Sequence, residues 1–447
     1  MRNKIYILLM FFSFIMVGCG EVTTTDGRVI NSTGTSSNNN NSTDNSLTND
    51  LNSRNSISDI NSSNDKLKIT GKVTYDRVHV NSSGIGLNYN NITKEVVKQV
   101  IVKAIRLNGQ VIASTTTDDN GDYTLDNLPP NIDLKVQVYA QMQKSGMGGW
   151  DLKVVDNTNS NSQYVMESSS ISLTDNSLRV NLNAGSGWNG SRYNSERTAA
   201  PFAVLGSIYQ AMQKVLSADS RVNFPALIVN WSENNVASGN GSEAELRDGQ
   251  IITSHYDGNQ QLWILGDANG DTDEYDNHII IHEWGHYFED QFSRADSIGG
   301  SHGAGDYLDI RVAFGEGWGN GWSAIVTDDP IYYDTMDIRQ SNGFFMDIEN
   351  QAPDNPGWYS EASIQRILYD LYDSHNDGAD TLSLGFKPIY DVLVSSQKTT
   401  PAFTSIFSFI TYLKEQNPSV TDKIDAILAS ENIGSIQDIY GSTIDNN

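Results

Sequence analysis

The chain has 447 residues, of which 38% are hydrophobic, and it carries 29 Lys and Arg against 55 Asp and Glu. This length exceeds what one hydrophobic core supports, so we expect two or three domains. The formal net charge of −26 excludes a nucleic-acid partner bound through a basic surface. The single cysteine excludes a disulfide framework and a zinc site with several cysteine ligands.

The N-terminus has the pattern of an export signal. A positively charged start and an apolar run of 13 residues (5–17) precede Gly18 and Cys19. The run is shorter than the roughly 20 residues of a spanning helix. The string Met-Val-Gly-Cys that ends at Cys19 resembles the lipobox of bacterial lipoproteins, with Met where that family usually has Leu. The resemblance implies a signal peptide over residues 1–18 and acylation of Cys19, which becomes the new N-terminus.

Residues 19–65 are polar and rich in Asn, Ser and Thr. Such a segment buries too little apolar surface to offset the conformational entropy of folding, so we expect a disordered tether. With the lipid anchor, it predicts a membrane-attached protein of the bacterial cell envelope, at the outer membrane or the cell surface.

From residue 66 the hydrophobic pattern alternates with a period of two. In 132–140, Ile, Leu, Val, Val and Ala alternate with polar residues and Tyr, which indicates a half-buried strand. Asn108-Gly109 lies between two apolar runs, which is a strong hairpin signal. These features predict a small antiparallel sandwich.

The string Thr117–Leu125 (TDDNGDYTL), followed by Leu128-Pro129-Pro130, resembles the carboxypeptidase regulatory-like (transthyretin-like) fold. The resemblance covers 66–142 and implies a seven-stranded, all-β accessory sandwich without chemistry of its own. Residues 143–190 continue as a β-rich extension with short strand-like runs.

Five of the seven histidines fall between residues 255 and 302, and two of them form the string His282-Glu283-Trp284-Gly285-His286. On a helix, positions i and i+4 share one face, so both imidazoles can reach one metal ion. Glu283 is then placed to accept a proton from a water that zinc activates for attack on a carbonyl. Two histidines hydrogen-bonded in a core remain the alternative.

A catalytic zinc site needs a third protein ligand and one open position. Glu316, in the string FGEGWGN, is the best candidate because it lies 30 residues after His286, on a second predicted helix (312–326). Asp306, Asp309 and His302 are its rivals.

The two strings HEWGH and GEGW together resemble the gluzincin metallopeptidases, especially the fungalysin group and more distantly the thermolysin-like enzymes. The resemblance covers about 260–322 and implies zinc on His282, His286 and Glu316, with Glu283 as general base. The run 261–267 is similar to the edge strand that pairs with substrate in thermolysin-like enzymes.

The chain departs from this family in two places. Asn320 stands where the family has an Asp that orients a zinc histidine. Asn320 can accept a hydrogen bond from that histidine, but it lacks the negative charge of an Asp. The family's oxyanion-stabilising histidine has no clear counterpart. Tyr359, before a predicted helix, is a candidate for that role, and His302 and His375 are its rivals.

Two acidic segments, 267–273 and 373–380, place oxygen ligands as calcium loops do. The first lacks Gly at its sixth position and has His278 at its twelfth, so it fails the EF-hand pattern. We expect solvated turns, although the resemblance to thermolysin-like enzymes, which often bind structural Ca²⁺, keeps a calcium site open.

These features together predict a lipoprotein with an all-β sandwich followed by an α+β zincin-type domain over 191–447. The predicted activity is zinc-dependent hydrolysis of peptide bonds outside the cytoplasm, endoproteolytic in type, with peptides or proteins as substrate. The alternatives are a non-catalytic surface adhesion lipoprotein, with structural histidines, and a zinc-binding pseudopeptidase.

Overall fold

The computed structural model describes residues 66–83, 85–174, 176–303, 305–375 and 380–444. The predicted signal peptide, Cys19 and the tether lie outside these residues. Within the described part of the chain, no helix is both long and apolar enough to cross a membrane.

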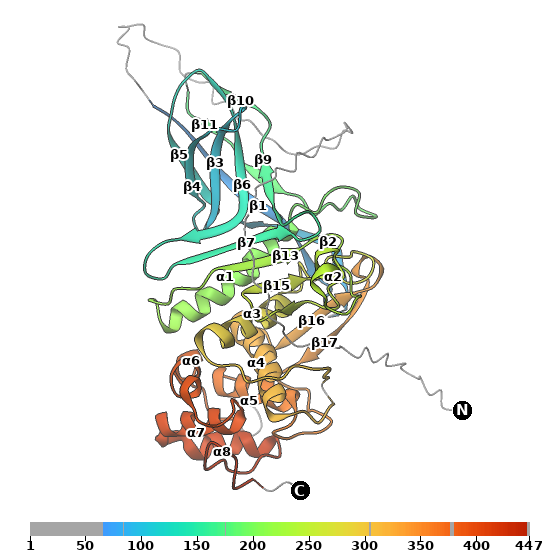
Figure 1. The fold of residues 1–447 in the computed structure, drawn as a ribbon, viewed down its shortest axis with the longest axis vertical. Coiled ribbons are helices and arrows are strands. Elements are labelled where there is room, and N and C mark those ends of the chain that lie inside the picture. The colour runs from blue at the N-terminus through green and yellow to red at the C-terminus, as the bar shows by residue number, and fades with distance from the viewer. Residues whose placement is uncertain (1–65, 84, 175, 304, 376–379, 445–447) are drawn as a thin grey trace, which may run out of the picture.

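The chain is a mixed α/β structure in which strands gather at one end and helices α4 to α8 at the other, with α1 and α3 between them (Figure 1). The strands of the N-terminal half are β1 Leu67–Val80, β2 Leu87–Val96, β3 Val100–Arg106, β4 Val111–Thr116, β5 Asp122–Leu128, β6 Ile132–Lys144, β7 Trp150–Asp156, β8 Ser162–Gln163, β9 Val165–Glu167, β10 Ile171–Leu173, β11 Leu178–Arg179 and β12 Leu182–Ala184. The later strands are β13 Leu227–Trp231, β14 His255–Tyr256, β15 Gln261–Ile264, β16 Ile331–Met336 and β17 Asn342–Asp347.

Eight α-helices occur in the described residues: α1 Ala200–Ala218, α2 Glu243–Arg247, α3 Asn277–Phe292, α4 Ile310–Thr327, α5 Glu361–Tyr372, α6 Phe386–Val392, α7 Ile406–Gln416 and α8 Thr421–Ser430. Short helical turns are η1 Ile338–Gln340, η2 Leu393–Gln397 and η3 Pro418–Val420. The predicted helices around Glu316 and after Tyr359 are α4 and α5.

A five-stranded sheet is centred on β1. Strands β2 and β5 pair with β1 in the antiparallel direction, whereas β11 and β12 pair with it in the parallel direction. Within 66–142 all strand pairings are antiparallel, as predicted for the sandwich, and the parallel strands β11 and β12 belong to the β-rich extension. The long connection through β2 to β10 returns the chain beside β1 in the same direction.

The second sheet has ten strands, with the main order β14-β15-β13-β7-β6-β3-β4. Strand β6 buries Leu134, Val136, Val138 and Ala140 and exposes the residues between them more, as the alternation predicted. The turn at Asn108-Gly109 joins β3 to β4 as predicted, and Gly109 has a φ of 88°. Strand β7 pairs in parallel with β13, so this sheet runs without a break across residue 190.

The predicted edge strand lies inside the sheet. Strand β15, which begins the run 261–267, pairs with β13 on one side and with β14 on the other. The two-residue strand β14 is therefore the edge. The period-two pattern could not reveal this, because β14 is too short to show any alternation.

Helix α3 lies in the centre of the helical region, packed against α4 and α1. Its buried apolar side chains include Ile280, Ile281, Trp284, Tyr287 and Phe288. A helix buried on this scale is held rigidly by packing, which suits it to carry a functional site.

Candidate metal centre

Helices α3 and α4 carry the predicted ligands on facing sides. Helix α4 begins after Asp309, whose side chain accepts a hydrogen bond from the backbone N–H of Arg311 at 3.0 Å. This cap places Glu316 two turns into the helix, opposite the turn of α3 that holds His282 and His286.

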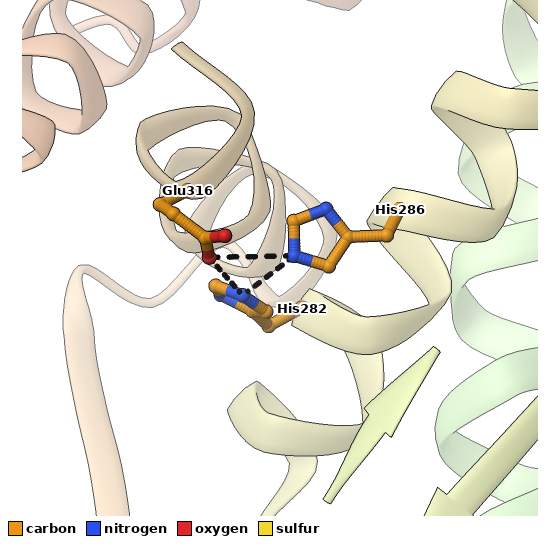
Figure 2. A group of neighbouring side chains, drawn as sticks. All are labelled: His282, His286 and Glu316. Atoms are coloured by element: carbon orange, nitrogen blue, oxygen red, sulfur yellow. Dashed lines mark hydrogen bonds and ion pairs between the residues drawn. The ribbon is translucent and has the colours of Figure 1, made fainter. Parts of the chain in front are cut away.

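The structure brings His282, His286 and Glu316 together (Figure 2). Oε2 of Glu316 lies 3.3 Å from Nε2 of His282 and 3.4 Å from Nε2 of His286. The two Nε2 atoms are 3.0 Å apart. We refer to these three side chains as the metal triad.

The donor set of the metal triad fits zinc. Two imidazole nitrogens and one carboxylate oxygen are ligands that catalytic zinc sites use. Bonds of about 2.0–2.1 Å in tetrahedral geometry place ligand atoms about 3.4 Å apart, which is close to the two distances from Glu316. One ion can therefore contact all three atoms.

Asn320 orients the ring of His282, one of the three possible metal ligands. Its Oδ1 lies 2.8 Å from Nδ1 of His282, so Nδ1 carries the proton and the lone pair of Nε2 points toward the triad. Of the two histidines of the HEWGH string, His282 is therefore the one that Asn320 contacts.

The charges of the metal triad compensate one another. Burial by itself raises the pKa of Glu316, but the positive charge of His286, together with the contacts to Nε2 of both triad histidines, holds that pKa well below its usual range. The triad therefore keeps Glu316 as an anion, which is the form that binds metal.

Close helix packing needs glycine at two places in α4. A Cβ on Gly319 would lie 2.7 Å from Cε1 and Nδ1 of the His282 ring. A Cβ on Gly317 would lie 2.4 Å from Cβ of Ile364 in α5. The two glycines therefore let α4 pack directly against the His282 ring on α3 and against α5.

Glu283 lies beside the metal triad without joining it. Its Oε1 is 4.0 Å from Nε2 of His282, and its Oε2 accepts a hydrogen bond from the backbone N–H of Tyr256 at 2.9 Å. The edge strand β14 thus orients the predicted general base. The sequence did not reveal this contact, because a backbone donor leaves no trace in residue type.

His302 also reaches the metal triad. Its Nε2 lies 3.4 Å from Oε2 of Glu316, and its Nδ1 lies 2.8 Å from Oε2 of Glu361 at the start of α5. Burial by itself lowers the pKa of His302, but the hydrogen bond to Glu361 and the charge of Glu316 outweigh it and raise that pKa to about 9. The sequence did not indicate a role for Glu361, because nothing in the chain order shows that α5 meets the loop before α4.

The other candidates have contacts elsewhere. The Tyr359 hydroxyl donates a hydrogen bond to the carbonyl of Pro356 at 3.4 Å, and its ring packs on Tyr307. His375 is almost fully exposed, and its Nδ1 lies 3.8 Å from Asp373. Asp309 caps α4, and Asp306 is exposed. Of the three rivals for the oxyanion role, the structure brings only His302 to the triad.

Comparison with known proteins yields no match by sequence and only distant likenesses to solved structures. No family model and no curated protein matches the chain. The precursor of protealysin, a metalloproteinase from Serratia proteamaculans, matches 64% of this chain and 88% of its own, with 12% identity and a TM-score of 0.36. The major plantain pollen allergen Pla l 1 matches 27% of this chain and 94% of its own, with 16% identity and a TM-score of 0.17. Both TM-scores are too low for either likeness to support an argument about function.

Proposed function

We propose that this protein hydrolyses peptide bonds with zinc held by His282, His286 and Glu316. The observation that carries the proposal is the convergence of the metal triad with Glu283 and His302 around one point. Each of the three parts that such hydrolysis requires is present: ligands, a base and a hydrogen-bond donor.

Zinc bound by the triad would supply a Lewis acid that lowers the pKa of water toward about 7 and polarises a carbonyl. The N–H of Tyr256 holds the carboxylate of Glu283 in position. From there, Glu283 accepts the proton of the attacking water. Glu283 then passes this proton to the nitrogen of the leaving amine. Asn320 fixes the ring of His282 during these steps.

His302 serves as the donor to the oxygen that gains negative charge. Because its Nδ1 donates to Glu361, a second proton on Nε2 makes the ring a cation that can donate toward the triad. Glu361 holds the ring in position and stabilises this charge. His302 thus takes the role for which Tyr359 and His375 were the other candidates.

The substrate backbone pairs with the edge strand β14. Its partner β15 covers one side, and in the described part of the chain no strand covers the other. An extended peptide added there passes beside Glu283, which Tyr256 of β14 contacts. An extended substrate fits an endopeptidase acting on peptides or proteins.

The predicted export signal and the lipid anchor on Cys19 place this activity outside the cytoplasm, in the bacterial cell envelope. In the sequence, the polar segment 19–65 separates the predicted anchor from the described residues. Incorporation of labelled palmitate into wild type, and its loss in Cys19→Ala, tests the anchor.

The test of the proposed activity is cleavage of a mixed peptide library by the full chain, read by mass spectrometry, with wild type beside Glu283→Gln. We expect products from wild type that are lost in the variant and suppressed by a zinc chelator. Asp290→Asn, an acidic neighbour on the same helix, is the matched control and should keep the activity. If neither folded wild type nor folded Glu283→Gln releases cleavage products, the proposal is refuted.

One observation favours a second candidate, the zinc-binding pseudopeptidase. Nε2 of His302 is as close to Glu316 as the triad histidines are. If His302 were a fourth ligand, the site would be closed, as structural zinc sites are. That protein would hold stoichiometric zinc and cleave nothing.

A further inference from the structure

A cavity of about 280 Å³ lies between strands β1 and β2 and helix α1. Its walls come from β1, from the end of β2 with the two residues that follow it, from α1, and from Asn277, the first residue of α3. The cavity shares no residue with the metal triad. Its volume is close to that of the smallest pockets that hold small molecules in proteins.

The floor of this cavity is buried, and its mouth is open to solvent. At the floor, Tyr75, Arg77 and Phe202 are each 8% exposed or less. At the mouth, Gly206 and Gln210 of α1 are exposed. A Cβ on Gly206 would lie 3.3 Å from the hydroxyl oxygen of Tyr75, so any larger residue there would crowd the cavity. A small molecule can therefore enter from solvent and reach the buried Arg77.

Two side chains of opposite charge line the cavity from one face of the sheet. Tyr75 and Glu95 are directly opposite in the β1–β2 ladder, and Arg77 follows two residues later on β1, so Arg77 and Glu95 are diagonal neighbours. Arg77 donates to the carbonyl of Tyr275 at 2.6 Å, and Glu95 accepts from the hydroxyl of Tyr75 at 2.6 Å. Within the described residues, neither takes part in an ion pair. A buried charge without an ionic partner is costly, and the guanidinium of Arg77 has further N–H donors to offer a ligand.

The buried carboxylate closest in sequence to the cavity, Asp276, does not replace a ligand. Burial raises the pKa of Asp276 to about 7, and its Oδ2 accepts hydrogen bonds from the N–H and hydroxyl of Thr335. The charge of Arg77 acts on Asp276 without forming an ion pair with it. Asp273, three residues earlier, is only 2% exposed, so the acidic segment 267–273 ends in a buried carboxylate and is not the solvated turn that the sequence predicted.

The remaining lining combines a polar donor with apolar side chains. Oδ1 of Asn277 accepts a hydrogen bond from the hydroxyl of Ser207 at 2.8 Å, which leaves the amide N–H groups of Asn277 as donors. Val97, Phe202 and Leu205 are buried apolar residues of the wall, each 3% exposed or less. A mostly apolar lining with a few charged and polar groups is typical of pockets that bind small molecules.

We propose that this cavity binds a small zwitterion, a free α-amino acid with an apolar side chain. The carboxylate of the ligand pairs with Arg77 and its ammonium group pairs with Glu95, so one molecule compensates both charges. A ligand with a single charge would leave one of these two side chains without an ionic partner. Asn277 donates to the same carboxylate, and the apolar side chain of the ligand contacts Phe202 and Leu205.

The bound amino acid links three parts of the chain. Arg77 and Glu95 belong to β1 and β2, Phe202 and Leu205 belong to α1, and Asn277 begins the helix that carries His282 and His286. The ligand therefore ties the strand-rich end of the protein to the first turn of α3, without contacting the metal triad.

The test is isothermal titration calorimetry of the full chain with L-leucine, L-methionine and L-phenylalanine. We expect at least one of them to bind about 10- to 100-fold more tightly than its amide, which lacks the carboxylate, and than its deaminated acid, which lacks the ammonium group. Glu95→Gln should lose the preference over the deaminated acid, and Arg77→Gln the preference over the amide. Lys94→Gln, exposed on the opposite face of β2, is the matched control and should bind as wild type does.

Two results would overturn the proposal: no binding of any of the three amino acids to folded wild type, or undiminished binding in both Glu95→Gln and Arg77→Gln. If Arg77→Gln does not fold, Gly206→Leu, which fills the cavity from α1, takes its place and should abolish binding. A chelator that removes zinc should leave the affinity unchanged, whereas loss of binding would place the amino acid at the metal triad and overturn the site. These readouts do not depend on peptidase activity, so they stand apart from the proposed function.

Discussion

Gly319→Ala probes the packing of α4 on the metal triad. In the helix the new Cβ would lie 2.7 Å from Cε1 and Nδ1 of His282 and 2.9 Å from its Cγ. The ring cannot turn aside freely, because Asn320 and the other two triad residues hold it.

The size of the effect follows from these distances. Carbon contacts are most favourable at about 3.5–4.0 Å, so the ring must retreat by about 0.8 Å. Metal–ligand bonds tolerate deviations of about 0.2 Å. We therefore expect Gly319→Ala to weaken zinc binding about 10- to 100-fold, as when a ligand loses its support.

The assay is competition for zinc with a chromophoric chelator. Gly315→Ala is the matched control, since its Cβ would meet nothing closer than 3.6 Å on the same helix. It should bind zinc as wild type does and gain up to about 1 kcal/mol in helix stability. Wild-type zinc affinity in folded Gly319→Ala would refute this account of the site.

Three further predictions concern the surroundings of the triad. Asn320→Ala should weaken zinc binding about 10- to 100-fold, and Asn320→Asp should keep wild-type affinity, both measured with the same chelator. Unchanged zinc affinity in Asn320→Ala would contradict the role of Asn320. His302→Gln should lower kcat about 100-fold with zinc content intact, and an unchanged kcat would exclude His302 as the donor. Burial raises the pKa of Glu289 to about 8 in the folded chain, so folding takes up a proton and wild-type stability falls between about pH 5 and pH 8. Urea unfolding should therefore show the advantage of Glu289→Gln growing over that window, by up to about 1.4 kcal/mol per pH unit, whereas a constant difference would contradict the burial argument.

Local patterns in the sequence predicted the elements that carry the site. The HEWGH string predicted a helix that the structure has as α3, and the second predicted helix, over 312–326, is α4. Spacing of four residues on a helix places two side chains together whatever the tertiary structure is. The convergence of His282 and His286 could therefore be read without the structure.

Contacts between distant segments could not be read in this way. The pairing of His302 with Glu361 joins residues 59 positions apart. The same limit explains the wrong edge strand. Which strand lies outermost depends on how the sheet is ordered, and β14 is too short for its own pattern to show it.

Anomalous diffraction at the zinc absorption edge, from crystals of the full chain, tests the central claim most directly. We predict one zinc peak within about 2.0–2.2 Å of Nε2 of His282, Nε2 of His286 and a carboxylate oxygen of Glu316, with His302 outside bonding distance. No peak at the triad, or a zinc closed by His302 as a fourth protein ligand, would contradict a catalytic zinc centre.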